Sequence, residues 1–353
     1  MKITINDVAN LAGVSIKTVS RVMNNESGVR QSTIDKVRVA ATELNYQPSQ
    51  AARNLASKRS YVVGYIYDNP NAHYVIDMQN GILQTCKNNH FELLIYPVNS
   101  KSPDFLEELS EMLKYSQISG VVLTPPLSEM LDVIRLLNTQ KIKVVRILSG
   151  QKPPENISPC VLVNDKQAAF QITEHLILQG HTKIAFLCGD RAHSSTQQRL
   201  SGYLNALEQY KIRINLDWVI DGEYLFESGV LACEQILALE QRPTAVFACN
   251  DEIAAGALFA ARLNGLDVPK NLAIAGFEDN PFSRQTWPKL TTAAQPTRQI
   301  ASQAAELLLQ TFKPNNKNEN SINSIVFEPK LVVRESTSYS IIKNQFKTGQ
   351  TKQ

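Results

Sequence analysis

Residues 4–24 read TINDVANLAGVSIKTVSRVMN, and this stretch decides the fold of the N-terminal part of the chain. In its first half, apolar residues recur at helical spacing and stop at Gly13; they are Ile5, Val8, Ala9, Leu11 and Ala12. Gly13 tolerates the positive φ that a tight interhelical turn often requires. Ser15 is a favourable N-cap for a second helix that runs to about Met23. Two short helices joined by such a turn predict a helix-turn-helix.

A third helix is predicted to complete a small all-α head. It opens near Ser32 and carries its apolar side chains on one face: Ile34, Val37, Ala40, Ala41 and Leu44. Pro48 bars its continuation, because proline lacks a backbone N–H and disfavours helix at the preceding residue. One more short helix of small residues can follow over residues 49–57, with Ser49 as its cap. We therefore place the head at residues 1–47 and a short helix with its linker at residues 48–60.

The second helix of the head presents two different faces. Val19 and Val22 face the small core of the head. Lys17, Arg21 and Asn24 are spaced i, i+4 and i+7 and point away from it. Hydroxyl groups flank this stripe at Ser15, Thr18 and Ser20. A helix in the DNA major groove needs cationic or amide groups for base edges and short hydroxyls for phosphates. An ordinary solvated helix face is the alternative interpretation.

Charge is distributed unevenly along the 353 residues. Residues 1–60 contain nine lysines and arginines and four acidic residues, so their net charge is +5, whereas the remaining residues carry −2. A small basic head on a slightly acidic body indicates that the head meets a polyanion. The chain is longer than one hydrophobic core usually organises, so two or three folding units are expected.

From Tyr61 onward, short apolar runs alternate with amphipathic helices. The predicted strands are residues 62–67, 91–97, 120–123, 143–147, 183–188, 245–248 and 272–276. The predicted helices are residues 74–88, 105–115, 167–178, 198–210, 227–239, 252–264 and 297–312. This alternation predicts an α/β body of two Rossmann-like lobes with parallel sheets, over residues 61–340. The first lobe takes residues 61–161 and 293–318, and the second takes 162–292 and 319–340. The polar tail, residues 341–353, is expected to be disordered.

The N-terminal motifs resemble those of the lactose-repressor/galactose-repressor family of bacterial transcription regulators. The resemblance continues through Lys36-Val37, Ala41, Leu44–Pro48 and Ala52–Ala56. It implies a DNA-binding set of Thr4, Ser15, Ile16, Lys17, Thr18, Ser20, Arg21, Asn24, Ala52 and Leu55. Within this set, Ile16, Lys17 and Arg21 take the positions that meet base edges. Ile16 offers no hydrogen bond, so a thymine methyl contact and a purely core role remain open alternatives.

Residues 49–57 resemble the hinge helix of that family, which folds when two copies meet on the operator. Leu55 then matches the leucine that wedges into the minor groove and bends the DNA. Ala52 and its alanine neighbours are small enough for two hinge helices to approach closely. This implies a homodimer on a near-palindromic operator. A tetramer is possible, but no leucine heptad follows Ser340, which favours the dimer.

The resemblance also implies an effector cleft between the two lobes. Ligands of such sheets bind beyond the C-terminal ends of the strands. The residues chosen on this basis are Asp68, Tyr74, His193, Arg199, Tyr224, Asn250 and Glu278. Arg146 and Asp165 are weaker choices, because Arg146 ends a strand and Asp165 can cap the following helix. The family usually has aspartate where Glu278 stands, so the longer side chain changes the reach of the carboxylate.

Polar pocket chemistry favours a sugar or glycoside as effector, with a purine or nucleoside as the alternative. We expect the effector to release the DNA, with corepression as the opposite possibility. An enzyme is the competing class of function, but residues 67–71 contain no G-x-G-x-x-G, and no Walker or G-x-S-x-G motif occurs. No cofactor or metal is expected, since the histidines lack ligand spacing. With no signal peptide or long apolar run and five separated cysteines, we expect a cytoplasmic protein.

Overall fold

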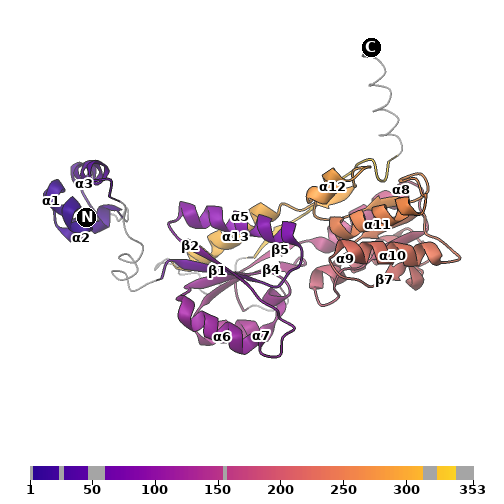
Figure 1. Ribbon diagram of the computed structural model, residues 1–353, viewed down its shortest axis with the longest axis horizontal. Coiled ribbons are helices and arrows are strands. Elements are labelled where there is room, and N and C mark those ends of the chain that lie inside the picture. Colours follow the sequence, from indigo (N-terminus) through magenta and orange to yellow (C-terminus); the bar gives the residue numbers. More distant parts are fainter. Residues whose placement is uncertain (1–2, 24–27, 47–59, 154–156, 313–323, 339–353) are drawn as a thin grey trace, which may run out of the picture. The chain divides into compact units, whose positions relative to one another are not determined.

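The computed structural model describes residues 3–23, 28–46, 60–153, 157–312 and 324–338 (Figure 1). The chain forms two compact units, Met1–Tyr61 and Val62–Gln353. The predicted hinge helix at residues 49–57 and the predicted disordered tail at 341–353 lie outside the described residues.

The described residues of the first unit form three helices: α1 (Ile5–Ala12), α2 (Ile16–Met23) and α3 (Gln31–Glu43). Gly13 ends α1 at a φ of 66°, which confirms the predicted turn. The Thr4 backbone N–H donates to the Asp7 carboxylate at 2.8 Å and fixes the start of α1. The Thr18 N–H donates to Ser15 Oγ at 3.2 Å, so Ser15 caps α2 as expected. The core of this unit comprises Val8, Ala9, Val19, Val22, Val37, Ala40 and Ala41.

The second unit contains two parallel sheets. The first has six strands in the order β11-β5-β4-β3-β1-β2. Their bounds are β1 Val62–Tyr67, β2 Glu92–Pro97, β3 Gly120–Leu123, β4 Lys143–Ser149, β5 Cys160–Val163 and β11 Ser324–Phe327. Helices α5 (Ala72–Asn88) and α13 (Thr297–Gln310) cover one face, and α6 (Phe105–Ser116) and α7 (Leu131–Thr139) cover the other (Figure 1). We call this sheet with its helices the first lobe.

The second sheet has four strands in the order β7-β6-β8-β9. Its strands are β6 Ile184–Leu187, β7 Val219–Ile220, β8 Ala245–Ala248 and β9 Ala273–Ala275. Its helices are α8 Asp165–Leu178, α9 Ser194–Gln209, α10 Phe226–Ala238, α11 Asp251–Leu263 and α12 Pro281–Gln285. This is the second lobe. A two-stranded antiparallel ribbon, β10 (Thr292–Ala294) with β12 (Lys330–Val332), accompanies the chain as it passes between the lobes. The predicted architecture of two parallel α/β units is confirmed.

The structure corrects one part of the predicted lobe boundaries. Residues 319–340 were expected in the second lobe, yet β11 pairs in parallel with β5 at the edge of the first sheet. Ile325 and Phe327 pack against the core of the first lobe. An edge strand that buries only alternate side chains fits either sheet equally well, so the sequence pattern did not identify its partner. The first lobe also includes β5, which was not among the predicted strands.

Helix α13 and the last described segment of the body pack on different lobes. Helix α13 packs tightly on α5, because a side chain at Gly81 would meet the Arg298 carbonyl oxygen at 2.4 Å. This contact ties the helix that follows the second crossing firmly to the first lobe. The last described segment returns to the second lobe, where Ser336 Oγ donates to the Ile274 carbonyl at 2.5 Å. The lobes are therefore linked by three passages of the chain.

Candidate functional site

The exposed face of α2 carries the residues predicted to read DNA. Val19 and Val22 are buried, as expected. Ile16 is 50% exposed and lies outside the core of the head, which leaves its side chain available for an apolar contact with a partner. Lys17 beside it is exposed as well. The structure thus removes the core role as an alternative for Ile16.

Hydroxyl groups organise the start of this helix. Ser15 Oγ and Thr18 Oγ1 are 2.9 Å apart and share a hydrogen bond. Thr4 Oγ1 donates to Asp7 at 2.7 Å, at the start of α1. The other predicted DNA-binding residues divide into two groups. Ser20 and Arg21 are half-buried on α2. Asn24, Ala52 and Leu55 lie outside the described residues.

A small cavity of about 50 Å³ lies between the lobes and is lined by five of the seven predicted effector residues. These five are Tyr74, His193, Arg199, Tyr224 and Glu278. Asn69, Asn71, Ser149, Asp165 and Gln295 are further polar residues on its wall. Asp68 lines a neighbouring chamber instead. The structure therefore brings most of the predicted residues together at one place.

Asn250 is the predicted residue that lines neither space among the described residues. It is the N-cap of α11, and its Oδ1 accepts the Ile253 N–H at 2.9 Å. Its Nδ2 is buried and has no hydrogen-bond partner among the described residues. One role of Asn250 is thus structural, while a buried donor stays unused.

Arg199 is the most constrained charge in the cavity. It is only 4% exposed, and its Nε donates to Asp165 Oδ1 at 2.8 Å. Its Nη1 donates to the Cys249 carbonyl at 2.7 Å, and its guanidinium carbon lies 3.8 Å from the centre of the Phe277 ring. Stacking on an aromatic face and pairing with a carboxylate both stabilise a desolvated guanidinium. Its plane is therefore fixed before any ligand arrives.

Asp165, predicted as a helix cap, has another role. The cap of α8 is Asn164, whose side chain accepts the Gln167 N–H at 3.3 Å. Asp165 is therefore available to accept from Arg199 and from Ser149 Oγ. Asp165, a weaker candidate from the sequence, thus lines the cavity and pairs with Arg199.

Glu278 reaches the cavity from a strained turn. Its φ is 101° and that of Asp279 is 57°, in a region that non-glycine residues rarely adopt. Glu278 Oε2 accepts from Asn71 Nδ2 at 2.9 Å and from Asn280 Nδ2 at 3.3 Å. Burial raises the pKa of Glu278 to about 7, despite the opposing effect of Arg199. This carboxyl group is thus partly protonated near neutral pH.

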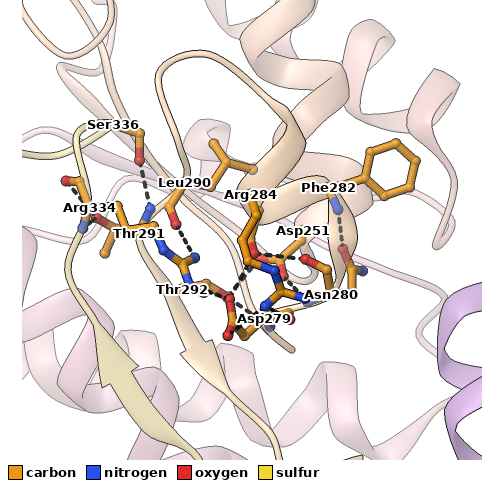
Figure 2. Close-up of polar contacts among 11 residues, drawn as sticks. Asp251, Asp279, Asn280, Phe282, Arg284, Leu290, Thr291, Thr292, Arg334 and Ser336 are labelled. Atoms are coloured by element: carbon orange, nitrogen blue, oxygen red, sulfur yellow. Dashed lines mark hydrogen bonds and ion pairs between the residues drawn. The ribbon is translucent and has the colours of Figure 1, made fainter.

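A hydrogen-bond network holds that turn in place. Figure 2 shows Arg284 and Arg334 converging on Asp279; Arg284 Nη1 is 3.0 Å and Arg334 Nη2 2.5 Å from its carboxylate oxygens. Beside them, the buried Asp251 accepts the Asn280 N–H at 2.9 Å and the Thr292 hydroxyl at 2.7 Å. Positive-φ residues cost about 1–3 kcal/mol each and persist where the surroundings over-determine them. The turn at Glu278 and Asp279 is held by three other segments of the chain, which contribute Asp251, Thr292 and Arg334.

Tyr224 and His193 form the wall on the second lobe. Their ring centres are 5.4 Å apart with an edge-on geometry. The Tyr224 hydroxyl lies 2.7 Å from Thr196 Oγ1. Gly189 leaves room for this ring, since a Cβ there would approach it to 2.5 Å. Burial lowers the pKa of His193, so the imidazole is neutral at neutral pH.

Besides the Ser149–Asp165 hydrogen bond and the His73–Phe282 ring contact, further polar contacts among the described residues join the lobes across the cleft. Asn71 of the first lobe donates to Glu278 of the second. Glu129 accepts the Ser194 N–H at 3.1 Å and its hydroxyl, at the start of α9. Lys101 Nζ is 3.1 Å from Asp190. Asn71 and Glu129 were not among the predicted site residues, although each follows a first-lobe strand by a few residues.

Other kinds of site find no support in the part of the chain that the structure describes. No group of three histidine, cysteine or acidic side chains there is placed to hold a metal ion. All five cysteines are buried and free. None of the described helices is long and apolar enough to cross a membrane.

Comparison with known proteins identifies both parts of the chain. Residues 4–49 match the family described as bacterial regulatory proteins, lacI family. Residues 173–337 match the periplasmic binding protein-like domain. The ribose operon repressor of Haemophilus influenzae is 34% identical over 333 residues, covering 94% of this chain and 98% of that protein.

Two further relatives are similar over almost the whole chain. The HTH-type transcriptional repressor PurR of Vibrio campbellii is 31% identical over 341 residues, covering 94% of this chain and 98% of its own. A crystal structure of the lac repressor dimer bound to operator and the anti-inducer ONPF has a TM-score of 0.75 and 26% identity. That match covers 96% of this chain and 99% of the lac repressor chain.

Proposed function

Because this chain belongs to the lacI family of bacterial regulatory proteins, we propose that it is a repressor of carbohydrate-utilisation genes. It binds a near-palindromic operator as a homodimer and responds to a small sugar or glycoside between its lobes. The observation that carries the proposal is the cavity whose walls, lined by polar side chains, come from both lobes, in a chain that also bears a helix-turn-helix. As a regulator bound to bacterial DNA, it acts in the cytoplasm and is not an enzyme.

The DNA-binding role is assigned to the exposed face of α2. Lys17 and Arg21 supply cationic donors for base edges, and Ile16 supplies an apolar contact to a thymine methyl. The hydroxyls of Ser15, Thr18 and Ser20, and Thr4 at the start of α1, contact phosphates. Asn24, Ala52 and Leu55 complete the set as sequence predictions, with Leu55 as the minor-groove wedge.

The effector role is assigned to the cavity between the lobes. Arg199 is neutralised by Asp165, so the cavity offers directional hydrogen bonds and little net charge for an anion. Glu278 and Asp165 accept from sugar hydroxyls, and Tyr74 and Tyr224 cover the apolar face of a ring. The ribose operon repressor among the relatives supports a sugar. The PurR relatives make a purine base or nucleoside the second candidate.

Control of DNA binding follows from the contacts between the lobes. An effector that enters the cavity competes with the Asn71–Glu278 hydrogen bond and changes the angle at which the lobes meet. That angle sets the separation of the predicted hinge segments in the dimer, and with it operator affinity. The expected sign is induction, in which the effector releases the operator.

The test combines two measurements on the full-length protein. Its operator is first selected from random DNA by the wild-type protein. A thermal-shift screen of sugars, glycosides, purine bases and nucleosides then identifies ligands of the folded state, which raise the unfolding temperature. The proposal requires that a sugar raises this temperature and lowers operator affinity. A purine that does so, with no sugar active, would favour the second candidate.

A further inference from the structure

A larger chamber of about 620 Å³ lies next to the small cavity. The two spaces share three wall residues, Asn69, His193 and Tyr224. The chamber is formed by loops that follow β1, β2 and β3 in the first lobe and β6 and β7 in the second. The two spaces therefore adjoin at these three residues.

The chamber differs from the cavity in its charge. Its described lining includes four carboxylates, from Asp68, Glu129, Asp190 and Glu223. Lys101 is the only lysine or arginine among those lining residues, and it is paired with Asp190. A phosphate or carboxylate group on a ligand would be repelled here, because like charges in a confined space interact strongly.

The chamber also offers groups that suit a hydroxyl-rich ring. Asp68 uses Oδ2 for the backbone and side chain of Ser100, at 2.8 and 2.6 Å, which leaves Oδ1 to accept further hydrogen bonds. Asn69 and Asn99 supply amide groups, and Tyr67 and Tyr224 supply aromatic surface. Carboxylates, amides and a ring face together match the donors and apolar face of a sugar.

We propose that this chamber is a second ring subsite, and that the effector is an unphosphorylated glycoside of two rings. One ring occupies the small cavity against Arg199 and Glu278, and the other occupies the chamber. The inference rests on the proposed sugar effector and specifies its size and charge. Both compartments draw walls from both lobes, so a two-ring ligand contacts each lobe twice. The second ring thereby strengthens the coupling between ligand and lobe angle.

The first test compares matched ligands by calorimetry with the full-length protein. Glucose is paired with cellobiose, galactose with lactose, and glucose with glucose 6-phosphate. The inference requires a disaccharide that binds at least about ten-fold more tightly than its monosaccharide, and a phosphorylated sugar that binds more weakly than its parent. A monosaccharide that binds as tightly as its disaccharide, or a tighter phosphorylated sugar, overturns it while leaving the sugar effector intact. Failure of every sugar contradicts the proposed sugar effector itself.

The second test fills the chamber without touching the small cavity. Ala192 lines the chamber only and is exposed, so Ala192→Trp adds bulk there, with Ala192→Ser as the matched control. The Ala192 N–H donates to Asp190, a bond that both variants retain. We expect Ala192→Trp to weaken disaccharide binding by about ten-fold and to change monosaccharide binding by less than about two-fold. Equal losses for both ligands, or no loss for the disaccharide, would contradict the second subsite. Unfolding temperatures confirm that the variants fold.

Discussion

The DNA-reading face of α2 and the effector cleft place their charges in opposite surroundings. Lys17 lies exposed on a helix whose inner face is held by Val19 and Val22, so folding does not depend on its charge. Arg199 and Asp165 are almost fully buried, and each is compensated by the other. On the head, DNA binding and stability are therefore separable, whereas in the cleft the same side chains determine both ligand binding and stability.

The largest effect is expected from breaking the buried ion pair. Arg199→Met leaves the Asp165 carboxylate buried without its cation and should lower the free energy of unfolding by about 3–5 kcal/mol. It should also abolish the effector response. Chemical denaturation and operator release measure the two effects. The control is Arg135→Met, whose partner Asp132 is also exposed, with an expected loss below about 1 kcal/mol. Similar losses in the two variants would remove the distinction between buried and exposed charges.

A second effect concerns pH and Glu278. In the folded protein the Glu278 carboxyl group keeps its proton up to a pKa of about 7. In the unfolded chain the same group loses its proton near the ordinary pKa of 4.5. The folded state binds more protons in this window, so the free energy of unfolding falls by about 3 kcal/mol as pH rises through it. Glu278→Gln should remove that part of the slope. Denaturation at several pH values, with the exposed Glu223→Gln as control, measures it; an unchanged slope in Glu278→Gln would refute the assignment.

The head should show a loss of binding without a loss of stability. Arg21→Ala should weaken binding to the selected operator by about 1–3 kcal/mol and relax sequence discrimination. Stability is compared at the exposed Lys17 instead: Lys17→Ala should leave the free energy of unfolding close to that of the wild type. Titration of operator and random DNA at one salt concentration provides the measurement, with Lys114→Ala in the body as control. Unchanged discrimination would remove Arg21 from the base-reading set.

The smallest effect is expected at an exposed charge of the cleft itself. Lys101 is 70% exposed, although its partner Asp190 is more enclosed. Lys101→Ala should change the free energy of unfolding by less than about 1 kcal/mol, because solvent screens such a pair. Denaturation of this variant beside Arg199→Met tests whether burial, rather than location in the cleft, sets the effect. A loss as large as that of Arg199→Met would show that location matters more.

The head could be predicted almost completely from sequence, because its signals are local. Gly13 marks the turn, Ser15 marks a helix start, and the spacing of Val19 and Val22 identifies the buried face. The body followed the same logic at the level of strands and helices. Arg199 and Glu278 could be assigned because each stands in a motif shared with a known family.

What escaped prediction depends on contacts between distant segments. Asp165 was undervalued because the strand before it, β5, was not predicted, and one of the two neighbours of β5 in the sheet, β11, lies more than 150 residues further along the chain. Asn71 and Glu129 acquire their roles only where the first lobe meets Glu278 and Ser194 of the second. Asn250 was expected in the cavity, but its side-chain oxygen Oδ1 accepts the Ile253 N–H and caps α11.

Glu129 has a consequence for the charge that the cleft can accept at the start of α9. Its carboxylate lies at the N-terminus of α9, where the helix dipole favours a negative charge. The protein thus carries its own anion at a place where a phosphate group would otherwise be welcome. A phosphate group at this end of α9 would meet the Glu129 carboxylate in place of free amide groups, so the charge of Glu129 disfavours a phosphorylated ligand there.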